Sequence, residues 1–156
     1  MPAKRLHTLL DEQGIDYEVQ EHPHAVSAQR LAATEGISGH IVAKPVMLSI
    51  GGELAMVVIP GSELLDLERA REVFGGNEVR LAEEAEFTEV FDDCELGAEP
   101  PFGHLYGLPT FLDEDLRSQP RIVCRDGTHT QTVTIAMTDY LLLVKPEIVD
   151  LAHGAA

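Results

Sequence analysis

Two apolar runs separated by Gly51-Gly52 place the strongest constraint on what this 156-residue chain can fold into. The runs span residues 41–50 and 54–59 and are rich in β-branched side chains. A Gly-Gly pair supplies the positive φ angles that a two-residue hairpin turn requires. The pattern therefore predicts an antiparallel hairpin that carries Lys44 and Pro45 inside its first strand.

The remaining patterns alternate between the helical and the extended period. Helices are expected over residues 3–13, from Ser27 to Gly36, from Ser62 to Gly75-Gly76, over 83–90, and from Thr138 to Pro146. Strands are expected over residues 17–20, 79–82, 110–112, 121–124 and 131–136. We therefore predict one α+β domain over residues 1–156, with a curved, mixed, mostly antiparallel, barrel-like sheet flanked by helices.

The charge balance restricts the partners. The chain has 11 Lys and Arg against 27 Asp and Glu, which gives a net charge of −16. That balance excludes a basic nucleic-acid surface over the whole molecule and adhesion to an anionic membrane. No apolar run reaches the roughly 20 residues of a membrane span, and no signal-peptide pattern is present, so we expect a cytoplasmic protein.

The common catalytic motifs are absent from the sequence. There is no nucleophile elbow, P-loop, dinucleotide fingerprint or H-E-x-x-H pair. His22-Pro23-His24 offers two histidines without a third ligand nearby, and the pair is interpreted as an exposed turn rather than a metal site. Cys124 lies in an apolar strand and Cys94 lies among acidic residues, so neither is expected to be a nucleophile. No metal or cofactor is predicted.

Lys44 is one of two features that suggest chemistry. An ammonium flanked by apolar residues on both sides needs a partner or a pocket, because burial of an unpaired charge is unfavourable. The alternative is an edge strand on which Lys44 reaches solvent, which Pro45 also favours. The residues alone leave both interpretations open.

The second feature is the loop from Gly97 to Gly103. Glycines at both ends let the backbone approach a ligand, and Pro100 and Pro101 stiffen the segment between them. Backbone N–H groups in such a loop can bind a carbonyl oxygen or an oxyanion. An ordinary tight connection is the alternative interpretation.

In this order, these features resemble the YbaK/prolyl-tRNA-synthetase-associated domain family of aminoacyl-tRNA editing domains, over nearly the whole chain. Lys44 matches the strand lysine of the family, and Gly97–Gly103 resembles its Gly-x-x-x-Pro loop. Further matches are the segments 21–23, 27–36, 107–113 and 127–129, and the closing residues Asp139, Tyr140, Leu143 and Pro146.

The resemblance implies a trans-editing deacylase that hydrolyses the ester of a mischarged tRNA at its 3′ end. The implied catalytic residues are Lys44, Gly97, Gly103 and His129. The implied substrate-binding residues are Arg30, Pro100, Pro101, Phe102, Gly127 and Thr128. Lys44 would anchor the phosphate or ribose, the loop would hold the carbonyl, and His129 would place water or cap the pocket. In some members the ribose hydroxyl of the tRNA helps to activate water.

Two departures from the family pattern keep other functions open. Pro45 stands where alanine-specific members often have asparagine, and the segment from Glu83 to Glu99 has no basic residue. The cations left to meet an acceptor stem are Lys44, Arg30, Arg121 and Arg125, so the expected tRNA contact is weak and local. The alternatives are a non-catalytic module that keeps the pocket for another small ligand or protein, and, less favoured, a metal-dependent hydrolase. The sequence leaves the edited amino acid and the oligomeric state open.

Overall fold

The structure is a computed structural model that describes residues 3–25, 27–75 and 78–154. The helices are α1 (Lys4–Glu12), α2 (Ala28–Glu35), α3 (Leu67–Val73), α4 (Glu84–Phe87), α5 (Glu114–Arg117) and α6 (Met137–Val144), with 3-10 turns η1 (Gly39–Ile41) and η2 (Gly103–Tyr106). The strands are β1 (Tyr17–Glu21), β2 (Ala43–Ile50), β3 (Glu53–Pro60), β4 (Leu64–Leu65), β5 (Val79–Leu81), β6 (Thr110–Asp113), β7 (Arg121–Arg125), β8 (Gln131–Ala136), β9 (Glu147–Val149) and β10 (Ala152–His153).

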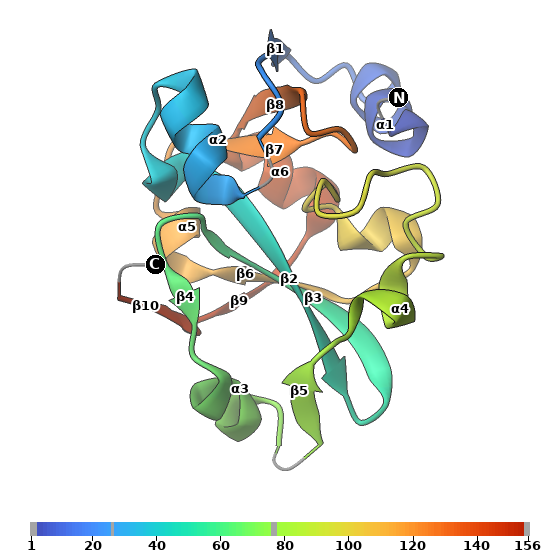
Figure 1. Cartoon of the computed structure of the whole chain (residues 1–156), viewed down its shortest axis with the longest axis vertical. Coiled ribbons are helices and arrows are strands. Elements are labelled where there is room, and N and C mark those ends of the chain that lie inside the picture. Colours follow the sequence, from blue (N-terminus) through green and yellow to red (C-terminus); the bar gives the residue numbers. More distant parts are fainter. Residues whose placement is uncertain (1–2, 26, 76–77, 155–156) are drawn as a thin grey trace.

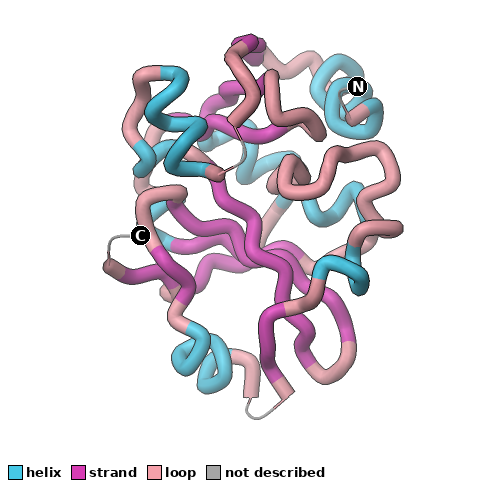
Figure 2. Tube along the Cα trace, in the orientation of Figure 1, coloured by secondary structure: helices cyan, strands magenta, loops and turns pink. Residues whose placement is uncertain are grey.

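The strands form three sheets, which confirms the predicted mixed α+β class. A five-stranded sheet has the order β5-β2-β3-β6-β9, a three-stranded sheet has the order β1-β8-β7, and β10 pairs with β4. All pairs are antiparallel except β3 with β6 and β6 with β9. The β2–β3 hairpin runs through the middle of the molecule, and the three-stranded sheet lies above it between α1 and α2 (Figures 1 and 2). The barrel is not closed.

The β2–β3 hairpin is confirmed in detail. Gly51 and Gly52 have φ angles of 59° and 85°, as a two-residue turn of this kind requires. Strand pairing runs without a break from Ala43 opposite Pro60 to Ile50 opposite Glu53. The central position of this hairpin follows from its length and from its burial on both faces.

Pro45 is tolerated in β2 because of where its nitrogen points. Gly61 N donates to Val42 O, and Ala82 N donates to Met47 O. Backbone groups of successive residues in an antiparallel strand point to opposite neighbouring strands, so those of Val42 point to β3 whereas those of Pro45 and Met47 point to the β5 side. Strand β5 begins to pair only beyond Pro45, at Leu48. The missing N–H of Pro45 therefore interrupts no hydrogen-bond ladder.

The two faces of the hairpin lie against different apolar clusters. Ala43, Met47, Met56 and Val58 contribute to the main core, which also holds Phe102 and Tyr140. Leu48, Val57 and Ile59 contribute to a second cluster under α3. A third, small cluster joins Ala25 and Leu31 to Val42 and Val123, and it seats α2 on the sheets. None of the described helices is long and apolar enough to cross a membrane.

Several local predictions were wrong. The helix expected from Ser62 begins only at Leu67, because Asp66 caps it by accepting a hydrogen bond from Arg69 N at 3.1 Å, and β4 occupies the preceding residues. Ile41 ends a 3-10 turn instead of starting a strand. The helix expected over 83–90 keeps its helical part only from Glu84 to Phe87. Helix α5 and strands β9 and β10 were not predicted, since they are short and depend on tertiary contacts.

The buried carboxylate of Asp113 holds the C-terminal strands in place. Its Oδ1 accepts hydrogen bonds from Leu151 N at 2.7 Å and Ala152 N at 2.8 Å, and its Oδ2 accepts one from Asp115 N at 3.0 Å. The side chain is fully buried. These three bonds give β10, which is two residues long, a fixed position beside β4.

We predict that Asp113→Asn lowers the free energy of unfolding by about 2 kcal/mol, because an amide nitrogen would face backbone donors. Urea unfolding followed by circular dichroism measures the change. Asp16→Asn at an exposed position is the control and should leave stability within about 0.5 kcal/mol of wild type. Equal stability of the two variants would show that the three hydrogen bonds contribute nothing net.

Candidate functional site

The predicted glycine loop and the predicted Gly-Thr-His turn lie together. Glu95 N donates to Gly127 O at 2.8 Å, and Gly127 N donates to Ala98 O at 2.9 Å. His129 N donates to Glu95 Oε2 at 3.1 Å, and His129 Nε2 donates to Leu96 O at 2.7 Å. Four hydrogen bonds thus join two segments about 30 residues apart in the sequence.

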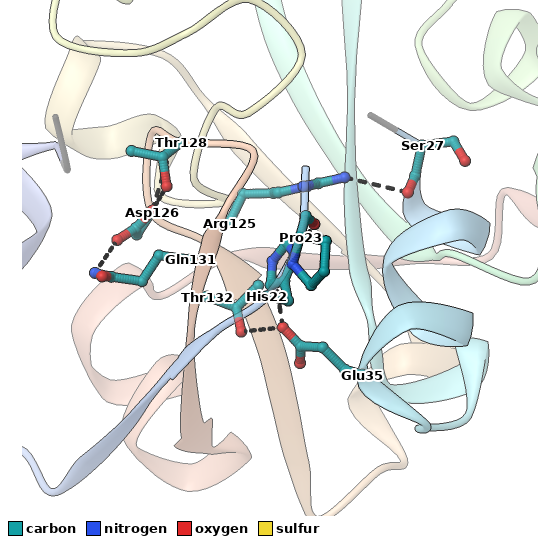
Figure 3. Close-up of polar contacts among 9 residues, drawn as sticks. All are labelled: His22, Pro23, Ser27, Glu35, Arg125, Asp126, Thr128, Gln131 and Thr132. Atoms are coloured by element: carbon teal, nitrogen blue, oxygen red, sulfur yellow. Dashed lines mark hydrogen bonds and ion pairs between the residues drawn. The ribbon is translucent and has the colours of Figure 1, made fainter. Parts of the chain in front are cut away.

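Asp126 fixes the turn that carries His129 (Figure 3). Its Oδ1 accepts from Thr128 Oγ1 at 2.9 Å and from Thr128 N at 3.2 Å, and its Oδ2 accepts from Gln131 Nε2 at 2.6 Å. The side chain is fully buried, and His7 Nε2 of α1 lies 3.3 Å from Oδ2. Thr128 therefore supports the turn from inside and has a structural role here.

Gly127 is required by close packing as well as by backbone conformation. Its φ angle is +100°, and a Cβ atom there would lie 2.9 Å from the backbone nitrogen of Ala3. The Ala3 nitrogen in turn donates to Asp126 O at 2.6 Å. The start of α1 is thereby fastened against the turn.

The ring of His129 is buried. Nε2 faces the carbonyl oxygen of Leu96, so Nε2 carries a proton and donates it to this oxygen. Nδ1 is buried and has no hydrogen-bond partner among the described residues. The ring packs on Gly97, where a Cβ would lie 3.3 Å from its Cε1 atom, and the His24 ring lies against it, tilted by 52°, with a centroid distance of 4.9 Å.

The Gly97 amide already has a partner in this structure. Glu99 Oε2 accepts a hydrogen bond from Gly97 N at 2.8 Å, and Ala98 N donates to Glu95 O. Glu99 is 7% exposed, and burial raises the pKa of its carboxyl group, against the lowering effect of the Gly97 amide. The donors that were expected to hold a substrate carbonyl are therefore occupied by groups of the loop itself.

The second half of the loop is anchored in the core. Pro101 O accepts a hydrogen bond from Tyr140 Oη at 2.6 Å, and the Phe102 ring is fully buried against Tyr140. Pro100 is also buried. A Cβ on Gly103 would lie 2.5 Å from Thr110 Oγ1 and 3.3 Å from Met56 Cβ, so a larger residue here would require β6 or β3 side chains to shift. These contacts fix the second half of the loop against the core.

Lys44 lies apart from the loop and the turn. Its side chain is half-buried, and Nζ donates to Glu63 O at 2.5 Å. No hydrogen bond or ion pair joins it to residues 97–103 or 127–129 within the described parts of the chain. Burial lowers the pKa of Lys44, while the Glu63 carboxylate acts in the opposite direction. Burial and a hydrogen bond with Asp115 raise the pKa of Glu63 to about 7.

Helix α2 is held beside the site by buried polar contacts (Figure 3). Arg125 Nη2 donates to Ser27 O at 3.1 Å, and Thr132 Oγ1 donates to Glu35 Oε2 at 2.8 Å. His22 Nε2 lies 3.4 Å from the same Glu35 oxygen, with both side chains almost completely buried. The expected exposed turn at His22 was therefore wrong, because this side chain faces Glu35.

The cations expected to meet an acceptor stem differ in their accessibility. Arg30 is exposed on the first turn of α2, and Arg121 is exposed at the start of β7. Arg125 is only 4% exposed, so it serves as an internal counter-ion instead. The nearby carboxylates of Glu35 and Glu99 act to raise the pKa of Arg125 against the larger lowering effect of burial.

Both thiols lie in environments that oppose ionisation. Burial raises the pKa of Cys94 to about 12, and Asp93 adds to this effect. Cys124 is completely buried, and burial raises the pKa of its thiol well above the ordinary value. Neither group supplies a thiolate near neutral pH.

Three contributors to the site were not identified from the sequence. Asp126, Glu95 and Glu99 are acidic residues within an acidic chain, so composition did not distinguish them. The Asp126-Gly127 pair is a turn signal that would have pointed to Asp126. For Glu95 and Glu99 no local pattern predicts the contacts, because both depend on how the loop folds back against the turn.

With the site described, comparison with known proteins identifies the class. The model of the aminoacyl-tRNA editing domain family matches residues 22–143. The chain belongs to the aminoacyl-tRNA editing domain family. No protein of curated function matches it in sequence.

Solved structures with the same fold match almost the whole length of this chain. One is described as a candidate trans-editing enzyme for prolyl tRNA synthetase; it is 27% identical, with a TM-score of 0.82 and 97% of each chain covered. Another, solved in work on epitope backbone grafting by computational design, is 25% identical, with a TM-score of 0.82 and 97% of each chain covered. A third, described as a candidate signal transduction protein from Marinobacter aquaeolei VT8, shares the fold at 19% identity and a TM-score of 0.73, with 96% of this chain and 30% of that chain covered.

We predict that Gly127→Ala lowers the free energy of unfolding by about 3 kcal/mol, because it combines an unfavourable φ angle with a clash against Ala3. Gly14→Ala is the matched control, since Gly14 has a φ angle of +65° but no atom within 4 Å of an added Cβ. That control should cost only about 1 kcal/mol. Urea unfolding measures both, and similar losses would mean that the turn can move away from α1.

Proposed function

We propose that this chain is a trans-editing deacylase that hydrolyses the ester bond of a mischarged aminoacyl-tRNA at its 3′ end. The observation that carries the proposal is the pairing of the loop at Gly97 with the turn at His129, within a chain of the editing family. The proposal implies a cytoplasmic protein with a local contact to the acceptor end of tRNA, because that is where its substrate forms.

The proposed chemistry needs orientation more than a strong nucleophile. An aminoacyl ester is an activated acyl group, and each tenfold gain in rate requires only about 1.4 kcal/mol of transition-state stabilisation. In the bound state, the ester carbonyl replaces Glu99 Oε2 as the acceptor of the Gly97 N–H. His129 closes the pocket over Gly97, and the ribose hydroxyl of the tRNA assists the attacking water.

Lys44 has a separate role in this proposal. Its ammonium is held at Glu63 O, on the side of β2 that faces away from the main core, and it is assigned to a phosphate or ribose of the terminal nucleotides. With Arg30 and Arg121 as the other exposed cations near these elements, the tRNA contact is restricted to the acceptor end. The large negative charge of the chain opposes wider contact with phosphates.

The deciding experiment is a deacylation assay of the wild-type protein against a panel of mischarged tRNAs. We expect hydrolysis of at least one ester, measured as loss of labelled amino acid from tRNA, at a rate well above spontaneous hydrolysis. Correctly charged tRNAs are the control and should remain intact. Failure to hydrolyse any member of the panel would reject the deacylase and favour a non-catalytic module.

We predict that Lys44→Ala lowers deacylation at least tenfold, because a phosphate or ribose contact of the substrate is lost. The melting temperature should change little, since the Lys44 ammonium has one backbone partner and no ion pair with any residue that the structure describes. Lys4→Ala at an exposed position of α1 is the control and should keep the wild-type rate. Full activity of Lys44→Ala would leave Lys44 with a purely structural contact to Glu63.

We predict that Cys94→Ser keeps at least half of the wild-type deacylation rate, because a thiol with a pKa of about 12 is not a nucleophile near neutral pH. The assay is run alongside intact-protein mass spectrometry during turnover. A covalent acyl adduct that forms in the wild type and is absent from Cys94→Ser would overturn the non-covalent mechanism.

A further inference from the structure

A buried pair of titratable side chains, His22 and Glu35, joins the end of β1 to the last residue of α2 (Figure 3). His22 Nε2 lies 3.4 Å from Glu35 Oε2, and the two side chains are only 2% and 1% exposed. Neither residue has a role in the proposed hydrolysis. Because burial of unpaired charge is unfavourable, the number of protons held by this pair decides whether the contact is stable.

The hydrogen bonds around the pair show how many protons it needs. His22 Nδ1 lies 2.7 Å from Pro23 O, and a carbonyl oxygen only accepts, so Nδ1 carries a proton. Glu35 Oε2 already accepts a hydrogen bond from Thr132 Oγ1 at 2.8 Å. Without a further proton, the lone pair of His22 Nε2 would face a carboxylate oxygen, which is repulsive. The contact is therefore favourable only when the pair holds one more proton.

The charges packed against the pair favour an imidazolium on His22. Glu35 Oε1 is buried and has no hydrogen-bond partner among the described residues. Arg125 on β7 is a permanent cation near Glu35, but several carboxylates share its guanidinium. The carboxylates that act on Arg125 are those of Glu35, Glu99, Asp126 and Glu95. A second cation at His22 therefore balances negative charge that Arg125 alone does not.

Helix α2 depends on its docking contacts, because it has eight residues and an isolated helix of that length is unstable in water. Its apolar contact is the small third cluster, to which it contributes Leu31 and Ala32. At the start of the helix, Arg125 Nη2 donates to Ser27 O. The Glu35 carboxylate fastens the other end of α2 to the sheet, so loss of its contacts frees that end.

His22 itself is held in place independently of α2. Its backbone N–H donates to Thr130 O at 2.8 Å, and Ala25 N donates to His129 O at 3.0 Å. The charged neighbours of His22 along the chain, Glu21 and His24, are both exposed to solvent. A change in the protonation of the pair therefore moves α2 and leaves His22 where it is.

We propose that His22 and Glu35 form a proton-dependent latch that holds α2 against the three-stranded sheet and releases it as the pH rises. With the extra proton in place, an imidazolium–carboxylate pair closes the contact. When the proton leaves, a buried carboxylate faces a lone pair, and the end of α2 opens to bring Glu35 into water. The extra proton stabilises only the docked state, so docking is stronger at the acidic end of the histidine range, about pH 5 to 8, than at its basic end.

The test measures amide hydrogen exchange at about pH 6 and about pH 8 in wild type, Glu35→Gln and Glu18→Gln. Rates are divided by those of an unstructured peptide at the same pH, which removes the intrinsic pH dependence of exchange. Glu35→Gln keeps an acceptor for Thr132 and offers an N–H to the lone pair of His22 Nε2, so its contact needs no extra proton. Glu18 is exposed on β1, and Glu18→Gln is the matched control for loss of a carboxylate.

We expect the protection of α2 amides in wild type and Glu18→Gln to fall at least about fivefold from pH 6 to pH 8, while amides of β2 and β3 keep theirs. In Glu35→Gln the protection of α2 should change by less than about twofold. A wild-type protection that does not fall, or an equal fall in Glu35→Gln, would overturn the latch.

Nitrogen NMR of the His22 ring in wild type tests the latch without any variant. We expect Nε2 to carry a proton at about pH 6 and to lose it over the interval in which α2 loses protection. A His22 ring that stays neutral or stays doubly protonated over this whole interval would reject the proposal. Neither measurement uses tRNA, so the latch stands or fails independently of the deacylase.

Discussion

The buried carboxylate of Asp126 is the group on which the rest of the site depends. It satisfies Thr128, Gln131 and a ring nitrogen of His7, and its backbone oxygen holds the start of α1. A fully buried carboxylate is stable only with several such donors, and loss of its partners typically costs about 3–5 kcal/mol. The turn that carries His129 is therefore held by buried side-chain contacts as well as by backbone hydrogen bonds.

The glycine loop is positioned by its hydrogen bonds to this turn. Residues 95–98 bond to the turn through backbone groups, and Tyr140 and the core around Phe102 fix the other end of the loop. The loop is thus held at both ends while Gly97 itself stays exposed. Such a segment can keep its shape when a ligand replaces a single internal hydrogen bond, which is what a preorganised binding site requires.

Much of the fold could be predicted because its strongest signals are local. The Gly51-Gly52 turn, the Ser27 cap of α2 and the glycine that ends α2 each act through the backbone within a few residues. The false cap at Ser62 has the same origin, since Asp66 is an equally good local cap and tertiary pairing of β4 with β10 decides between them. Strands β9 and β10 could not be predicted, because they are placed by pairing with β6 and by the Asp113 carboxylate, both distant in sequence.

The candidate site likewise depends on contacts between distant segments, which no local sequence pattern predicts. That Gly97 and His129 lie together was implied by the family resemblance and by no local pattern, because the turn and the loop meet only in the folded chain. The separation of Lys44 from them follows from strand register: Lys44 is paired with Ile59, whose side chain lies in the second apolar cluster, whereas the loop packs on the main core. The contact of Glu99 with the Gly97 amide spans two residues, yet it requires a loop conformation that only the turn imposes.

The acidity of the chain restricts the tRNA contact that the proposed function requires. The nucleotides of the proposed substrate carry phosphates, which the net charge of −16 repels. Burial lowers the pKa of the Arg125 guanidinium, and the carboxylates of Glu35, Glu99 and Asp126 act in the opposite direction, so this buried cation is balanced internally. Under the proposed function, contact with phosphates is therefore restricted to a few cations, which are Lys44, Arg30 and Arg121.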